Sequence, residues 1–464
     1  MKLRLRRTSS VKNQRFLPPS PKGKALRPRG CKLPDKLEFG DTIFMIETIQ
    51  LFPGVTLRCH RDDRFKQGCL SLQFVRPMGQ EASQNALLPA VWLRGTKKHP
   101  DLRSITLRLD DLYGASVSAL VRRIGDYQTT GLYCGFMEDR FAMDGDRILA
   151  PMASFLRELL LEPVLENDGF SREFVESEKK NLISTLETER NDKRAYAAGQ
   201  LLRTMCREDT FGIPRLGRVA WVKEIDAVSL YQHHQKLLKE SAVELFYVGS
   251  QPAETVAELL RPLFADLERD WKPLPGQKAF RDAGNCDKTE KMDTKQSQLC
   301  LGFVTDITIA SPQFAAMQVL NTIFGGGMTS KLFMNVREKM SLCYSVGSGY
   351  YGSKGIVTVN AGIDAAREGV ARQEILRQLL ACQSGDITGE ELAAAKEAVL
   401  SGLRGVHDSP GAIEGYYATG NLSGLGMTPE MYREKIEAVT MEDVVAVAGT
   451  LRLHTRYFLE GVGA

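Results

Sequence analysis

The stretch Tyr-Ala-Ala-Gly-Gln-Leu at residues 196–201 returns 221 residues later as Tyr-Ala-Thr-Gly-Asn-Leu at residues 417–422. Two further pairs of similar segments keep the same order, 72–75 with 301–304 and 224–229 with 435–440. Similarity that repeats in order, at an offset that shrinks slowly from 229 to 211, indicates a duplicated structural unit. The sequence therefore predicts two homologous halves.

Each half shows the same coarse order of secondary structure. Apolar or alternating runs predict strands at 69–75, 131–137 and 243–248, and again at 299–304, 356–363 and 456–459. Charged amphipathic stretches predict helices at 148–161, 172–189, 368–382 and 390–403, and the segment from Thr388 to Glu391 forms a capping box for the last of them. The mixture lacks strict strand–helix alternation, which favours an α+β fold of two homologous α/β sandwich domains with antiparallel or mixed sheets.

Composition sets the domain boundaries. Residues 1–35 predict a basic, disordered tail, since the first 30 residues hold ten Lys or Arg, no acid and several prolines. We expect a first domain at 36–266, a polar linker rich in Pro and Gly at 267–292, and a second domain at 293–464.

The charge of +4 belongs to the tail, because the remaining residues carry 51 basic against 57 acidic side chains. An acidic body disfavours nucleic-acid binding by the fold, although a tail function in RNA binding or organelle import stays open. No run of about 20 apolar residues is present, so we expect no membrane span. Nine cysteines without a Cys-x-x-Cys pair favour a reducing, cytoplasmic location, with a mitochondrial one as the alternative because of the Arg-rich start.

Two glycine-rich segments resemble phosphate-binding motifs but lack their context. The Gly-x-Gly-x-x-Gly at 347–352 precedes an expected strand, whereas a dinucleotide fingerprint opens a helix. The segment Gly-Gly-Gly-Met-Thr-Ser-Lys at 325–331 has Ser330 where a P-loop needs glycine before its lysine. We interpret the second segment as a flexible or substrate-facing loop between two helices.

The histidines do not form a metal motif. None has a second histidine four residues further on, and the adjacent His233 and His234 point about 100° apart on a helix. The group of Cys59 and His60 with nearby Asp62 and Asp63 is expected to be a surface loop.

Arg337 and Tyr344 are chemically suggestive. A guanidinium holds a peptide carbonyl or carboxylate with a forked geometry, and a phenol donates a proton to a developing oxyanion. Composition alone predicts a surface ion pair for Arg337 and a buried position in a strand for Tyr344.

Taken together, the duplicated halves, the loop at 325–331 and the segment at 336–346 resemble the insulinase-type (M16) metallopeptidases. In two-domain members of that family one subunit carries the zinc site, and the other contributes its glycine-rich loop or its Arg and Tyr across the dimer. The resemblance implies substrate-binding roles for Gly325, Gly326, Gly327, Arg337 and Tyr344 in a partner's active site.

Active relatives carry His-x-x-Glu-His on a first-domain helix, with Gly-Thr five residues after the second His. Here Gly95 and Thr96 set that register, which places the ligand positions on Ala86 and Ala90 and the base position on Pro89. Neither alanine nor proline supplies a donor atom for zinc or accepts a proton. The helix at 172–189, where the family's third ligand lies, still holds Glu178, Glu187 and Glu189. We therefore expect no metal and no cofactor in this chain, and no peptidase activity from the chain alone.

The residues at 109–115 resemble those of the non-catalytic member of a bacterial M16 pair associated with elongation factor P modification. The repeat maps Arg337 to Leu107 and Tyr344 to Gly114, so the first half lacks this pair of residues. The leading hypothesis is a non-catalytic subunit of a heterodimeric zinc metallopeptidase that binds peptides together with a zinc-bearing homologue. The alternative is a non-proteolytic scaffold or assembly protein with a peptidase-like fold.

Overall fold

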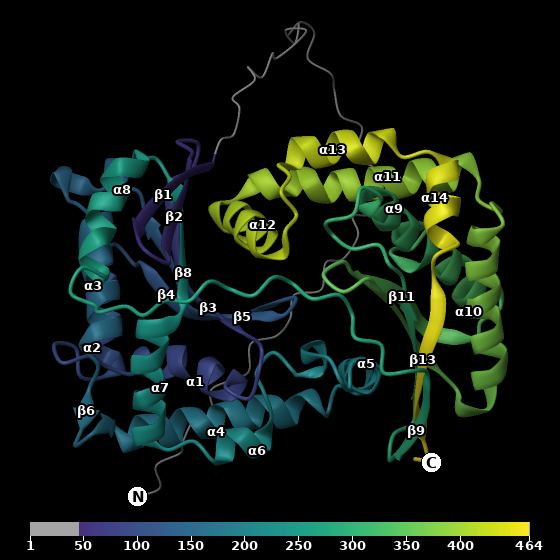
Figure 1. The fold of residues 1–464 in the computed structure, drawn as a ribbon, viewed down its shortest axis with the longest axis horizontal. Coiled ribbons are helices and arrows are strands. Elements are labelled where there is room, and N and C mark those ends of the chain that lie inside the picture. Colours follow the sequence, from purple (N-terminus) through teal and green to yellow (C-terminus); the bar gives the residue numbers. More distant parts are fainter. Residues whose placement is uncertain (1–45, 464) are drawn as a thin grey trace, which may run out of the picture. The chain divides into compact units, whose positions relative to one another are not determined.

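A computed structural model describes residues 46–463; the basic tail expected at 1–35 lies outside this range. The described part consists of two halves, each a β-sheet with helices packed on it (Figure 1). This confirms the predicted mixed fold with duplicated halves.

The first half contains a six-stranded sheet in the order β1-β2-β8-β3-β5-β4. Its strands are β1 (Ile46–Phe52), β2 (Val55–Arg61), β3 (Gln67–Pro77), β4 (Ser116–Ile124), β5 (Tyr127–Met137) and β8 (Ala242–Gly249), with a separate small pair, β6 (Leu165–Glu166) and β7 (Gly169–Phe170). Its helices are α1 (Ala82–Trp92), α2 (Leu102–Asp111), α3 (Leu149–Leu161), α4 (Arg172–Glu189), α5 (Lys193–Met205), α6 (Val219–Lys223), α7 (Ala227–Glu240) and α8 (Ala253–Leu260).

The second half contains a five-stranded sheet in the order β11-β12-β10-β13-β9. Its strands are β9 (Cys286–Met292), β10 (Ser297–Val304), β11 (Cys343–Tyr351), β12 (Ile356–Ile363) and β13 (Arg452–Gly461). Its helices are α9 (Phe314–Gly325), the π-helix η5 (Leu332–Lys339), α10 (Glu368–Gln383), α11 (Gly389–Arg404), α12 (Pro410–Ser423), α13 (Pro429–Ala438) and α14 (Met441–Ala448).

The two sheets have the same topology. The order β2-β8-β3-β5-β4 in the first half corresponds to β9-β13-β10-β12-β11 in the second. In both sheets one pair is parallel, β2 with β8 and β9 with β13, while the strands that follow pair antiparallel. Strand β9 lies within the segment 267–292 that the sequence suggested was linker; its polar, half-exposed residues suit an edge strand.

The repeated hexapeptides identified in the sequence lie on α5 and α12, and each of these helices packs on the sheet of the other half. Helix α5 lies against β10 and β13, and α12 lies against β3 and β8. Leu201 of α5 is buried with Tyr457 of β13, and Ile413 of α12 is buried with Phe246 of β8. The central strands β3 and β10 are therefore covered on both faces, which explains their nearly continuous burial.

Two buried ionic groups join the halves. Lys354, in the turn between β11 and β12, has no exposed side-chain surface and pairs with Asp126 at 2.8 Å and Asp209 at 3.1 Å in the first half. Glu414 of α12 is likewise fully buried and accepts two hydrogen bonds from Arg122 of β4, at 2.9 and 2.6 Å. Because unpaired buried charges are strongly unfavourable, these contacts specify how the halves pack.

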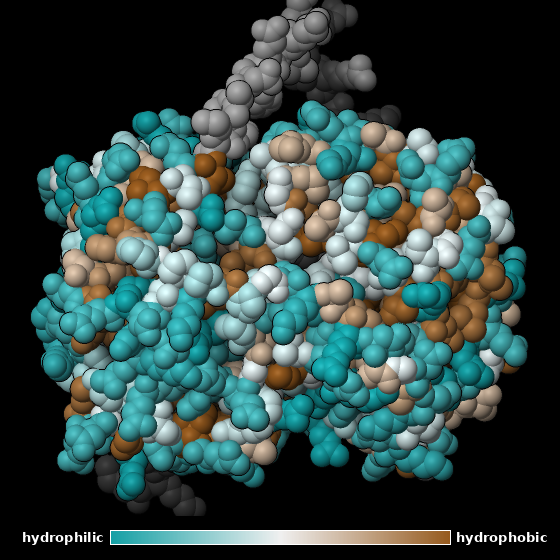
Figure 2. Space-filling view, viewed as in Figure 1, coloured by the Kyte–Doolittle hydropathy of each residue, from teal (hydrophilic) through white to brown (hydrophobic). Residues whose placement is uncertain are grey.

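Within residues 46–463 no helix is both long and apolar enough to cross a membrane. The face in Figure 2 is mostly hydrophilic, and hydrophobic residues appear on it in separate groups.

Candidate functional site

The structure brings Arg337 and Tyr344 into one pocket of about 510 Å³. Arg337 lies on η5 and Tyr344 near the start of β11, the edge strand of the second sheet. Two residues that the sequence did not single out, Asp364 and Arg367, also line this pocket. They follow β12, which is paired with β11, so the sheet brings them beside Tyr344.

The backbone around this pocket departs from regular geometry. The helix η5 has π-helical hydrogen bonding, which is rare and often found at functional sites. Ser341, between η5 and β11, has φ of 51°, in the left-handed region that a residue with a side chain seldom adopts. Its carbonyl accepts a hydrogen bond from Arg367 at 2.7 Å, which holds the turn in this conformation.

The two predicted binding residues present polar groups to the pocket. The guanidinium of Arg337 stacks on the Phe333 ring at 4.6 Å and lies 3.6 Å from Glu338. The Tyr344 hydroxyl donates to Asp364 at 3.3 Å. The composition-based prediction of a buried Tyr344 is wrong, because β11 is an edge strand and the side chain is 64% exposed. Both groups are accessible to a ligand.

The glycine loop lies further along β11. Helix α9 ends at Gly325, and a Cβ there would lie 2.7 Å from the backbone nitrogen of Ser348, so this glycine permits close packing on the strand. Gly326 and Gly327 are exposed. The prediction of a loop between two helices is correct, but these glycines do not line the pocket of Arg337 and Tyr344.

The positions that correspond to the family's metal ligands lie on α1. Ala86 and Pro89 are buried and Ala90 is partly buried, and Pro89 stands inside the helix. A methyl group has no lone pair to donate to zinc, and a prolyl ring has no group that accepts a proton. Among the described residues no group of three or more His, Cys, Asp or Glu is arranged to hold a metal ion.

The three candidate glutamates on α4 have different surroundings. Glu178 lies opposite α1 and accepts a hydrogen bond from Arg94 at 3.2 Å, so a cation of the chain itself neutralises this carboxylate. Glu187 and Glu189 lie towards the other end of α4 and line a separate pocket. The structure does not bring the three together at one site.

His233 and His234 make structural contacts in the first half. His233 contacts Asn85 at 2.7 Å and His234 accepts from Trp92 at 3.2 Å, and burial lowers the pKa of each imidazole to about 4. The prediction of a surface loop at Cys59 and His60 is wrong, because both residues are buried in β2. Burial also raises the pKa of the Cys59 thiol to about 12.

Comparisons with known proteins agree with this geometry. Residues 224–399 match the family described as "Peptidase M16 inactive domain". The "Probable inactive metalloprotease YmfF" of Bacillus subtilis (strain 168) is 29% identical over 409 residues, which is 88% of this chain and 96% of that protein.

Solved structures share the whole fold. A conserved protein from Enterococcus faecalis V583 superimposes with a TM-score of 0.85 and 29% identity, covering 90% of this chain and 99% of that one. A peptidase M16 inactive domain from Pseudomonas fluorescens gives a TM-score of 0.75 at 17% identity, covering 90% and 98%.

The fold is that of the M16-like peptidases, and α1 carries alanine and proline at the positions that correspond to the metal ligands and the base. In keeping with the resemblance in its sequence, the chain matches the M16 inactive domain family over residues 224–399 and is similar over most of its length to a relative named as an inactive metalloprotease.

Proposed function

We propose that this chain is the non-catalytic subunit of a heterodimeric M16-type zinc peptidase and that it binds peptide substrate next to the active site of a zinc-bearing homologue. The observation that carries this proposal is an asymmetry. Arg337 and Tyr344 share one accessible pocket in the second half, whereas α1 of the first half has alanine and proline at the metal positions.

The pocket chemistry suits a peptide backbone. The Arg337 guanidinium donates to a substrate carbonyl, and the Tyr344 hydroxyl turns from Asp364 to an oxyanion that develops on the scissile carbonyl. Because Arg367 pairs with Asp364 at 3.7 Å and holds the Ser341 carbonyl, Tyr344 is held near Arg337 before the ligand arrives. In this proposal zinc and the attacking water belong to the partner, since residues 46–463 of this chain hold no group of side chains arranged to bind a metal ion.

We further propose that the pair acts in the cytoplasm. The eight cysteines in the described part are free thiols, which is consistent with a reducing compartment. The link to elongation factor P modification belongs to the same proposal and rests on the resemblance of residues 109–115.

The test is co-expression with a zinc-bearing M16 homologue from the same organism, followed by cleavage of a quenched-fluorescent peptide library. We expect cleavage to require both chains. Arg337→Ala should lower kcat/KM by about 10- to 100-fold, the value of a hydrogen bond to a charged group. The matched control is Arg433→Ala, which removes an exposed arginine on α13, outside the pocket. Equal activity of the Arg337 variant and the wild type would remove the role assigned to this residue.

The scaffold alternative predicts a different assembly. Affinity purification of the chain from its native cell would then recover a large complex without a zinc-bearing homologue, and the Arg337 variant would assemble normally. Recovery of a single zinc-bearing homologue would instead support the peptidase pair.

A further inference from the structure

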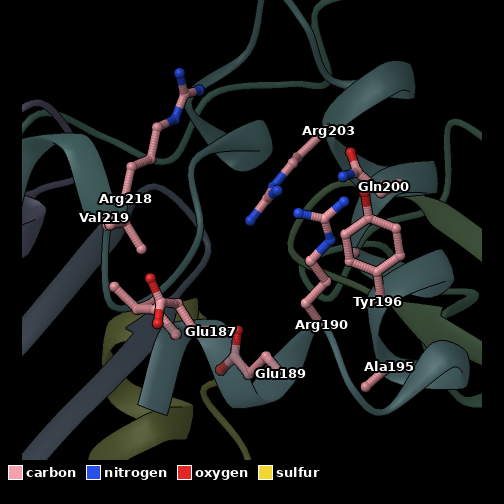
Figure 3. Close-up of a pocket in the computed structure, with 12 residues that line it drawn as sticks. Glu187, Glu189, Arg190, Ala195, Tyr196, Gln200, Arg203, Arg218 and Val219 are labelled. Atoms are coloured by element: carbon pink, nitrogen blue, oxygen red, sulfur yellow. The ribbon is translucent and has the colours of Figure 1, made fainter. Parts of the chain in front are cut away.

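A second pocket, of about 890 Å³, lies where α4 meets α5 in the first half (Figure 3). Three arginines line it: Arg190 at the end of α4, Arg203 on α5 and Arg218 before α6. Figure 3 shows the guanidinium groups of Arg190 and Arg203 pointing into the same space. Arg190 lies over the Tyr196 ring at 6.0 Å and Arg218 over the Trp221 ring at 4.9 Å, and within residues 46–463 none of the three arginines forms an ion pair. Because like charges repel one another, an anion between the guanidinium groups would be favourable.

Gly199 leaves space open on the pocket wall. It lies in the interior of α5, where glycine is less favourable than alanine, and a Cβ added there would meet nothing within 4 Å. The residue lines the pocket. The chain therefore leaves open a space on the helix that a larger side chain could have covered.

The internal repeat shows that the second half closes the equivalent space. Gly199 corresponds to Gly420 of α12, whose Cβ would meet Leu425 at 3.4 Å. At the offset of 221, Ala195 of the pocket wall corresponds to Tyr416, whose hydroxyl donates to the Met427 carbonyl. Arg203 likewise corresponds to Gly424. The open space and the arginine on α5 are thus features of the first half.

The charges on the wall narrow the class of ligand. Two neighbouring guanidinium groups, with Gln200 and Tyr196 beside them, match the planar oxygens of a carboxylate. Glu187 and Glu189 lie lower in the same view. Their negative charges repel a polyanion such as nucleic acid, whereas their carboxylates can accept hydrogen bonds from peptide N–H groups. The volume lies within the usual range for pockets that hold small ligands.

We propose that the pocket formed by Arg190, Arg203, Arg218 and Gly199 binds the carboxylate of a short peptide. The peptide as ligand rests on the proposed function, but this site is distinct from that of Arg337 and Tyr344, with which it shares no lining residue. It would select substrates or products that carry an acidic side chain or a free C-terminus.

The test is isothermal titration calorimetry on the full chain without a partner. Three pentapeptides serve as probes: one with a central Glu and an amidated end, one with a central Gln and a free carboxylate end, and one with Gln and an amidated end. We expect binding of one or both carboxylate peptides at millimolar concentration or below, with the third at least about tenfold weaker. The first two peptides distinguish a side chain from a terminus.

The variants locate the site. The double variant Arg190→Gln and Arg203→Gln should weaken binding about 10- to 100-fold. Gly199→Met should place a side chain in the space beside Arg203 and weaken binding without a change of charge. Arg194→Gln removes an exposed arginine of the same helix outside the pocket and should leave binding unchanged.

Equal binding of the three peptides, no binding at millimolar concentration, or full binding by the double variant would overturn the proposal. Circular dichroism verifies that each variant is folded. Because no cleavage is measured, failure here leaves the heterodimer proposal standing, and loss of cleavage in Arg337→Ala leaves this pocket untouched.

Discussion

Replacement of Lys354 by methionine should strongly destabilise the fold. The Lys354 side chain is fully buried between Asp126 and Asp209 and also donates to the Lys278 carbonyl at 3.1 Å. Methionine keeps most of the apolar stem, so the variant removes the positive charge with little change in packing. Two buried carboxylates then lose their common counter-ion.

The size of the expected loss in stability depends on the hydrogen bonds that the two carboxylates keep in the variant. Removing one partner of a buried ion pair costs about 3–5 kcal/mol. Asp126 still accepts from the Thr210 hydroxyl at 2.7 Å, and Asp209 still accepts from the Phe211 N–H at 2.7 Å. These remaining hydrogen bonds partly solvate the charges, so we expect a loss near the lower end, about 3 kcal/mol in the free energy of unfolding.

The loss should depend on pH. Burial raises the pKa of Asp126, but the hydrogen bonds that Lys354, Lys278 and Thr210 donate outweigh it, and the pKa lies below its ordinary value. At pH values above its unfolded pKa, wild-type Asp126 therefore stabilises the fold. This stabilisation is lost as pH falls through the folded pKa. Without Lys354 the pKa of Asp126 rises, because its buried carboxyl loses the counter-ion, so the stability deficit of the variant is largest at pH 7 and smaller at pH 4.

The assay is urea unfolding, followed by far-ultraviolet circular dichroism, at pH 7 and pH 4. The control is Lys291→Met, which breaks an ion pair with Glu460 at 3.8 Å in which Lys291 is 70% exposed. That change should alter stability by no more than about 0.5 kcal/mol. A Lys354→Met loss below about 1 kcal/mol at pH 7, or one of equal size at both pH values, would refute this reasoning.

Three further predictions concern stability. Burial lowers the pKa of His233 and of His234 to about 4. Their contribution to stability is complete above the unfolded pKa and is lost as pH falls from the unfolded pKa to the folded one. Urea unfolding should therefore show about 2 kcal/mol less stability per histidine at pH 5 than at pH 7. A free energy of unfolding that is the same at pH 5 and pH 7 would contradict this prediction. Gly199→Ala should raise the free energy of unfolding by about 0.5–1 kcal/mol, because the new Cβ meets nothing within 4 Å in α5. Gly131→Ala should be strongly destabilising in the same assay, since its Cβ would lie 1.8 Å from the Leu72 carbonyl oxygen.

Local patterns in the sequence predicted many of the elements closely. The expected helix at 172–189 coincides with α4, the expected strand at 356–363 coincides with β12, and the capping box at Thr388 opens α11. Such features depend on periodicity and on side chains that bond to nearby backbone groups, which act over a few residues. Cys59 and His60 were misplaced, because their short segment lacks a signal that separates a buried strand from a loop.

The candidate site was predicted in part. The segment 336–346 singled out Arg337 and Tyr344 together, and the structure places both in one pocket. Asp364 and Arg367 were missed, because they approach Tyr344 through the pairing of β11 with β12. The exposure of Tyr344 was also unpredictable from its apolar neighbours, since it follows from the position of β11 at the edge of the sheet.

By itself, the sequence determined the duplication, the type of fold, the family resemblance and the absence of donor atoms at Ala86, Pro89 and Ala90. Those conclusions need residue identity and spacing alone. The tertiary structure decided that α5 and α12 each cover the other half's sheet and that Lys354 is buried between Asp126 and Asp209. It also showed that the space beside Gly199 is open while the equivalent space beside Gly420 is filled. Contacts between residues hundreds of positions apart depend on how two complete surfaces fit, and local pattern does not record that fit.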